Sequence, residues 1–144
     1  MTHGIDTDFL VAAEISNHPF HPRADALIRS LLDAGHDFAL APQTLAEFVH
    51  VVTDARRMPQ PLTMPDAIVR AETWWEAEEV IRVFPNGRTV SDFFDWLRRH
   101  QPGRKRLLDT QLAATFRNAG VDRIVTNNAR DYGALGGFEI VSYN

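Results

Sequence analysis

Apolar and polar residues alternate in short blocks along this chain, and the blocks switch between strand-like and helix-like spacing. The run Gly4-Ile5-Asp6 is short, apolar and ends at an acid. Asp37 to Ala41 forms a second run of this kind, and Pro42 follows it directly in the position that suits the first turn of a helix. From Leu45 to Val52 the apolar residues recur at helix spacing. These blocks predict strands that each lead into a helix.

The same reading extended along the chain predicts an α/β fold with a mostly parallel central β-sheet flanked by helices. Two further strands are expected at Asp122–Thr126 and Phe138–Val141. The remaining helices are expected at Asp8–Ile15, Pro22–Gly35, Asp66–Arg82, Ser91–Arg99 and Arg106–Ala119. Residues 59–104 show helices and no evident strand. We therefore expect one domain over residues 1–144, with residues 59–104 as a helical lid over the sheet.

Composition fits one folded domain and removes several kinds of chemistry. The chain has 144 residues, of which 44% are hydrophobic and 24% are charged, a profile typical of a soluble globular protein. Cysteine is absent, which excludes disulfide scaffolds, Cys-ligated metals and thiol catalysis. The net charge of −4 argues against a protein that coats nucleic acid by bulk charge. It does not exclude a nuclease, which needs only a local basic surface beside an acidic site.

The sequence also bears on location. No stretch approaches the roughly 18 apolar residues of a membrane helix. Residues 1–6 carry an acid, Asp6, where a secretion signal would need apolar residues. We therefore expect a cytoplasmic protein without membrane contact.

Polar residues gather where the predicted strands end. Asp6 follows the first strand, Glu47 lies early in the helix after the second, and Asp109 lies in the first turn of the helix before the third. The loop Thr126–Asp131 follows the third strand. Open parallel sheets bind ligands beyond the carboxyl ends of their strands, so these residues are candidates for one site.

Each residue also has a purely structural interpretation. Asp6 could cap a helix, Asp109 could complement a helix dipole, and Asp131 could belong to a turn. Glu47 is harder to explain in this way, because its helix neighbours are apolar and a buried carboxylate is costly unless it is paired or coordinated. Carboxylates that converge repel one another unless cations are present. Hard divalent cations remove that repulsion and support hydrolysis of a phosphodiester.

Four blocks of the sequence carry a resemblance to a known family. They are Ile5–Leu10, Thr44–Phe48, Leu108–Ala114 and Ile124–Tyr132, and the expected strand Phe138–Val141 closes the series. In this order and at these spacings they resemble the PIN-domain ribonucleases, and within them the VapC-type toxins of prokaryotic toxin–antitoxin pairs. The resemblance covers essentially the whole chain and implies a PIN-like fold.

By this resemblance, Asp6, Glu47 and Asp109 would be the acidic residues of a catalytic metal site. A fourth polar position in the family follows the threonine of the last block. Asn128 occupies the matching place. Asp131 matches a frequent acid of the same block and is the alternative fourth residue. The sequence leaves both alternatives open.

The resemblance further implies supporting hydroxyls at Thr7 and Thr126. Asp8 departs from the family, which usually has Asn or Ser there. A protein of this kind would depend on Mg²⁺ or Mn²⁺ and cleave RNA endonucleolytically, with tRNA or rRNA as the RNA substrate. It would form a homodimer, through the lid or through the sheet-side helices, and a cognate VapB-type antitoxin would inhibit it.

The densest basic run of the chain leads into the helix that carries Asp109. Next to the proposed site it would hold RNA phosphates, to which the arginine fork is suited. The alternative is an ordinary solvated helix end and loop. The candidate RNA-binding residues are Arg98, Arg99, Arg104, Lys105 and Arg106.

Two other functions were weighed against a ribonuclease. Asp6-Thr7-Asp8 could form an aspartyl-phosphate in a phosphatase, but that chemistry needs a phosphate-binding lysine, and Lys105 is the only lysine. A non-catalytic PIN-fold module that binds RNA or protein is the main alternative. The acids Asp6, Glu47 and Asp109 argue against it, since an idle site has no need of Glu47 on an apolar helix.

Overall fold

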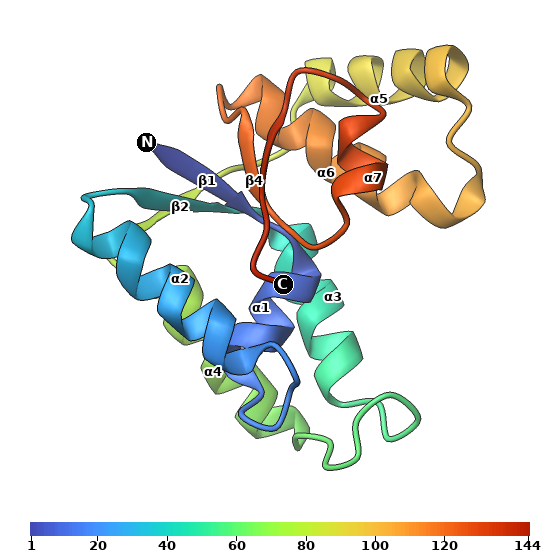
Figure 1. Ribbon diagram of the computed structural model, residues 1–144. Coiled ribbons are helices and arrows are strands. Elements are labelled where there is room, and N and C mark those ends of the chain that lie inside the picture. The colour runs from blue at the N-terminus through green and yellow to red at the C-terminus, as the bar shows by residue number, and fades with distance from the viewer.

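A five-stranded sheet forms the centre of the molecule (Figure 1), as described by a computed structural model of residues 1–144. All four strand pairings are parallel, and the spatial order is β3-β2-β1-β4-β5. This confirms the predicted α/β fold class. The strands are β1 (Thr2–Ile5), β2 (Asp37–Leu40), β3 (Val80–Arg82), β4 (Arg123–Val125) and β5 (Glu139–Val141).

Helices cover both faces of this sheet (Figure 1). One layer contains α1 (Thr7–Glu14), α2 (His21–Asp33), α3 (Pro42–Val52) and α4 (Met64–Glu76). The other contains α5 (Gly87–His100), α6 (Leu107–Asn118), α7 (Ala129–Gly133) and a short 3₁₀ turn at Arg104–Arg106. None of these helices combines the length and the apolar character that crossing a bilayer requires.

The sheet separates two cores, because successive residues of a strand face opposite sides of the sheet. On β2, Phe38 and Leu40 pack in the core shared with α1 to α4, whereas Ala39 packs in the core shared with α5 to α7. On β1, Ile5 belongs to the first core. Gly4 faces the second, where the ring of Phe116 on α6 lies 2.7 Å from the position of a Cβ atom at residue 4. The missing side chain of Gly4 therefore lets α6 approach the sheet.

The expectation that residues 59–104 contain no strand is wrong. The helix predicted at Asp66–Arg82 ends at Glu76, and Val80–Arg82 forms β3, which pairs in parallel with β2. This strand has three residues and lies at the edge of the sheet, and Ile81 is 44% exposed. It is too short to show an alternating pattern, and its pairing with β2 depends on residues about forty positions away, which local periodicity does not reveal.

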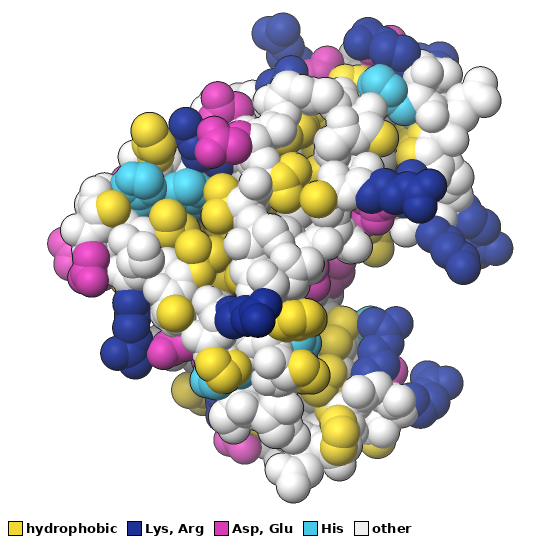
Figure 2. All heavy atoms as spheres, viewed as in Figure 1, with side chains coloured by type: hydrophobic (Ala, Val, Ile, Leu, Met, Phe, Trp, Pro, Cys, Tyr) yellow, Lys and Arg dark blue, Asp and Glu magenta, His cyan; other side chains and the backbone are white.

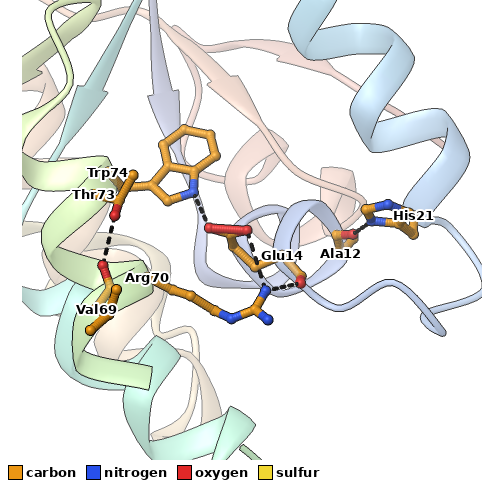
Figure 3. Close-up of polar contacts among 7 residues, drawn as sticks. All are labelled: Ala12, Glu14, His21, Val69, Arg70, Thr73 and Trp74. Atoms are coloured by element: carbon orange, nitrogen blue, oxygen red, sulfur yellow. Dashed lines mark hydrogen bonds and ion pairs between the residues drawn. The ribbon is translucent and has the colours of Figure 1, made fainter. Parts of the chain in front are cut away.

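Polar contacts fix α4 against the end of α1 (Figure 3). The indole Nε1 of Trp74 donates to Glu14 Oε1 at 3.0 Å, and Arg70 Nη1 donates to the backbone oxygen of Glu14 at 2.7 Å. Trp74 also packs edge-on against Phe38, with ring centroids 6.1 Å apart. These contacts join α4 to α1 and to β2 through one partly buried cluster.

Candidate active site

A polar pocket of about 380 Å³ opens at the carboxyl ends of β1 and β4. Five of the residues predicted from the sequence line it, namely Asp6, Thr7, Glu47, Asp109 and Asn128. Figure 2 shows the molecule hollowed between α3 and α6, with acidic side chains inside the hollow and lysine and arginine side chains on both rims. The site therefore lies where ligands bind in open parallel sheets.

Asp6 joins the ends of the two central strands. It directly follows β1 and is the N-cap of α1, where its Oδ1 accepts from the backbone N–H of Thr7 at 2.8 Å. Its Oδ2 accepts from Thr126 Oγ1 at 2.7 Å, across 120 positions of sequence. The side chain is 3% exposed. Asp6 thus has the capping role considered from the sequence and also faces the pocket.

Glu47 is held at the pocket by two donors from different elements. Thr7 Oγ1 donates to Glu47 Oε2 at 3.1 Å, and Gln43 Nε2, one turn earlier on α3, donates to Oε1 at 2.9 Å. Gln43 also donates to the backbone oxygen of Leu108 at 2.7 Å, which connects α3 to the first turn of α6. The two predicted supporting hydroxyls, Thr7 and Thr126, therefore each donate to one of the predicted acids.

Asp109 enters the pocket from the first turn of α6. The hydroxyl of Tyr132 on α7 donates to Asp109 Oδ1 at 3.5 Å. The Tyr132 side chain is fully buried, and burial with the nearby charges of Asp6 and Asp109 raises the pKa of its phenol. Tyr132 therefore stays neutral and donates its proton toward the acids.

Burial and the repulsion of nearby charges raise the pKa values of Asp6 and Asp109. Burial, followed by the charges of Asp8 and Asp109, raises the pKa of Asp6 to about 7. Burial, followed by the charges of Glu47 and Asp131, raises the pKa of Asp109 to about 6. Near neutral pH the ionised carboxylates of the pocket therefore repel one another, and a bound cation would reduce this repulsion.

The two alternatives for the fourth site residue differ in position. Asn128 lines the pocket, and its backbone N–H donates to Thr126 Oγ1 at 2.9 Å. Asp131 lies in α7 and its Oδ1 pairs with Arg106 Nε at 2.9 Å, outside the pocket lining. Asn128 thus shares the pocket lining with the other predicted residues, whereas Asp131 lies outside it, near enough to Asp109 for its charge to raise the pKa of that carboxyl.

Three polar residues of the pocket were not among the site residues predicted from the sequence. Asp8 is the second residue of α1, where its Oδ2 accepts from the backbone N–H of Asn127 at 3.1 Å. Its Oδ1 is buried without a hydrogen-bond partner. His18 and Arg57 reach the pocket from the loops that follow α1 and α3. The acids of Asp6-Thr7-Asp8 were a usable signal for Asp8, and the adjacent Arg56 and Arg57 were a weaker one for Arg57, whereas nothing local distinguishes His18.

The donor set fits a hard divalent cation. All the acidic side chains of the pocket offer oxygen atoms as ligands, and the buried Oδ1 of Asp8 has no hydrogen-bond partner, so it is available to a cation. As the side chains stand, no group of three or more acidic or histidine residues is close enough together to hold an ion. Mg²⁺ takes only one or two carboxylates and completes its shell with water and phosphate oxygens, so such a group is not required.

The predicted RNA-binding residues lie outside the pocket lining. Arg98 and Arg99 end α5, and Arg99 pairs with Asp95 one turn earlier. In the 3₁₀ turn that leads into α6, Arg104 and Lys105 are exposed, whereas Arg106 is paired with Asp131. Contact of this run with RNA stays a prediction.

Comparison with known proteins identifies the fold. No protein-family model and no curated protein matches the sequence. Among solved structures, VapC20 of Mycobacterium tuberculosis, a sarcin-ricin loop cleaving toxin, superposes with a TM-score of 0.71 at 18% identity, over 96% of this chain and 97% of that one. VapBC2 of Rickettsia felis, bound to a promoter DNA fragment, gives 0.72 at 13% identity over 100% of both chains. VapBC-1 of nontypeable Haemophilus influenzae gives 0.68 at 15%, over 99% and 98%.

These likenesses define the class of fold to which the chain belongs. It has the PIN-like α/β fold, with five parallel strands between two helical layers. Within that fold, it has the architecture of VapC toxins over essentially its full length.

The raised pKa of Asp6 gives the metal-free protein a distinctive pH dependence. Between about pH 4 and pH 7 the folded protein keeps a proton that the unfolded chain has lost, because the pKa of Asp6 is about 7 when folded and 3.8 otherwise. The associated stability is present below about pH 4 and is lost as the pH rises through 7. We expect Asp6→Asn, which cannot ionise, to raise the melting temperature in EDTA by roughly 5 °C at about pH 8.

Thermal unfolding of wild type and variant from about pH 5 to about pH 8 measures this effect. The gain from Asp6→Asn should grow with pH. Asp33→Asn, at the exposed end of α2, serves as the matched control and should give no such trend. Parallel curves for Asp6→Asn and wild type would show that Asp6 is not strained in the folded protein.

Proposed function

We propose that this protein is a metal-dependent endoribonuclease that hydrolyses phosphodiester bonds of RNA and acts as the toxin of a type II toxin–antitoxin system. One observation carries the proposal. Asp6, Glu47 and Asp109 come from three separate elements and line a single pocket at the carboxyl edge of a VapC-like sheet. The charges of these acids repel one another without a cation, and a phosphate backbone is the substrate that such a cation would bind.

In this proposal Asp6, Glu47 and Asp109 hold Mg²⁺ or Mn²⁺, with Asn128 as the fourth polar residue. The bound ion supplies activation of water and a clamp on the phosphate during in-line attack. Thr126 orients Asp6 through its 2.7 Å hydrogen bond, and the two donors to Glu47 keep its carboxylate on the pocket side of α3. The residues of the chain thus position the ion and the substrate.

We further infer a VapB-type antitoxin and a second copy of the chain as protein partners. VapBC complexes are among the structures with this fold, which supports an antitoxin. Met64, Ile68 and Val69 of α4 are between 44% and 62% exposed, which supports a surface that is covered in an assembly. Clusters of exposed apolar side chains are commonly buried between protein partners.

Cleavage of mixed tRNA and rRNA by the purified, partner-free protein tests the proposal. We expect fragments with Mg²⁺ or Mn²⁺ and none with EDTA. Either metal should also raise the melting temperature of wild type, as binding to the folded state requires, and should raise that of Asp6→Asn less. Metal-independent cleavage would contradict the site, and no cleavage of any RNA would favour a non-catalytic PIN-fold binding module. Growth arrest on expression, relieved by the neighbouring open reading frame, tests the toxin role separately.

A further inference from the structure

One wall of the acidic pocket carries an imidazole that the site as described does not use. His18 lies in the loop between α1 and α2 and lines the pocket. Its backbone is fixed at both ends, because its N–H donates to Ile15 O at 3.0 Å and its oxygen accepts from the N–H of His21 at 3.0 Å. The ring is therefore carried by an ordered turn.

The hydrogen bond to the ring determines which nitrogen carries the proton. Nδ1 of His18 accepts from the backbone N–H of Phe20 at 3.1 Å. A nitrogen that accepts a hydrogen bond has no proton, so the neutral ring has its proton on Nε2. Protonating Nδ1 would break this bond and set two donors against each other. The geometry thus makes His18 a donor through Nε2–H and excludes it as a general base in this tautomer.

The charged groups around His18 are compatible with a neutral ring. Burial is the main cause that lowers the pKa of His18, and His21 on α2 acts in the same direction. Asp8 on α1 opposes them. The pocket is also lined by Arg57 and by the predicted metal-site acids Asp6, Glu47 and Asp109.

The pocket has two chemically different parts. The acids lie at the edge of the sheet, whereas His18 and Arg57 come from the two loops at the ends of α1 and α3 that point away from the sheet (Figure 1). Arg57 has only donors, and the exposed guanidinium pairs with Asp54 at 3.7 Å. A bound polyanion would therefore meet the proposed metal ion at the acidic end of the pocket. At the other end it would meet the N–H donors of His18 and Arg57.

We propose that Nε2–H of His18 binds a non-bridging oxygen of a phosphate in the RNA strand, as an uncharged donor beside Arg57. The inference rests on the proposed function, because it takes RNA as the ligand. It assigns binding, and no proton transfer, to His18. A neutral donor displaces no counterions, so its contribution should not depend on salt, whereas the contribution of Arg57 should.

Fluorescence anisotropy of a labelled single-stranded RNA in EDTA tests this without cleavage. We expect His18→Ala to weaken binding by about tenfold, as for loss of a hydrogen bond to a charged group. His18→Gln places an amide near the position of Nε2 and should bind within about threefold of wild type. His50→Ala, exposed on α3 and outside the pocket lining, is the matched control and should bind as wild type does. Circular dichroism melts verify that each variant is folded.

Salt and pH distinguish a neutral donor from a cation. The slope of log K against log salt should be the same for His18→Ala and wild type, and should be smaller by about 0.7 for Arg57→Ala. The ratio of wild-type to His18→Ala affinity should stay constant from about pH 6 to about pH 8. A ratio that grows at low pH, or a reduced slope in His18→Ala, would overturn the neutral donor.

The outcomes separate this inference from the proposed function. Equal binding by wild type and a folded His18→Ala overturns the role of His18 and leaves the nuclease standing. If His18→Ala fails to fold, loss of binding in a folded His18→Gln equal to that of Arg57→Ala overturns the donor assignment. If wild type binds no RNA in EDTA, the role of His18 is overturned, whereas the proposed function stands or falls separately on cleavage of RNA with Mg²⁺ or Mn²⁺.

Discussion

Asp109→Asn is expected to lower the rate of RNA cleavage by about a hundredfold or more while leaving the protein folded. Asp109 stands in the first turn of α6 with its carboxyl in the pocket, and an amide would remove a charged metal ligand with little change in shape. The change also removes the repulsion with Glu47, which helps to raise the pKa of Asp109 to about 6, so stability should not fall. Single-turnover cleavage at saturating Mg²⁺, together with a thermal melt, measures both effects.

Asp131→Asn is the matched control for this change. Asp131 has the same chemistry and lies on the neighbouring helix α7, but it pairs with Arg106 and does not line the pocket. We expect its loss to reduce cleavage by less than about tenfold, since half-exposed ion pairs contribute little. A loss equal to that of Asp109→Asn would instead make Asp131 the fourth site residue. Full activity in Asp109→Asn would contradict the site as a whole.

Phe116→Ala is expected to lower the free energy of unfolding by about 3–5 kcal/mol. The ring is fully buried on α6, in the core between that helix and the sheet. Truncation leaves a cavity beneath α6, the helix that carries Asp109. Urea unfolding at about 25 °C, followed by circular dichroism, measures the change. The exposed Phe94 of α5 provides the matched control, and Phe94→Ala should change stability by less than about 1 kcal/mol.

The contact between Phe116 and Gly4 gives a further readout of the same packing. Gly4→Ala alone should destabilise the protein by about 1–3 kcal/mol, because its Cβ would lie 2.7 Å from the ring. Combined with Phe116→Ala, the added methyl enters the vacated space, so the double variant should lose less stability than the two single changes together. Additive losses would mean that α6 is not packed against β1 in this way.

Most of the fold was predictable because it follows from local periodicity. Pro42 begins α3 as predicted, and Gly35 follows α2 with a φ of 78°, in the left-handed region that glycine favours. The strand β3 was not predictable in the same way. Its three residues are held by pairing with β2, and the exposed Ile81 hides the alternation that a half-buried strand would show.

The candidate site divides along a similar line. Asp6 and Asp109 were noticeable because they stand at a strand end and a helix start, and Glu47 because its neighbours on the helix are apolar. The different positions of Asn128 and Asp131 could not be predicted from the sequence, because the ion pair of Asp131 with Arg106 at 2.9 Å joins α7 to the turn before α6.

By itself the sequence determined the class of fold, the order of the strands and helices along the chain apart from β3 and α7, and the candidate acids. These follow from backbone periodicity and burial, which act over a few neighbouring residues. Only the tertiary structure decided the order of strands in the sheet and the set of side chains that share the pocket. Thr126 meets Asp6 across 120 positions because β4 lies beside β1, and His18 and Arg57 arrive on two separate loops. Contacts of this kind arise from packing between distant segments, so the sequence of each segment carries no periodic signal for them.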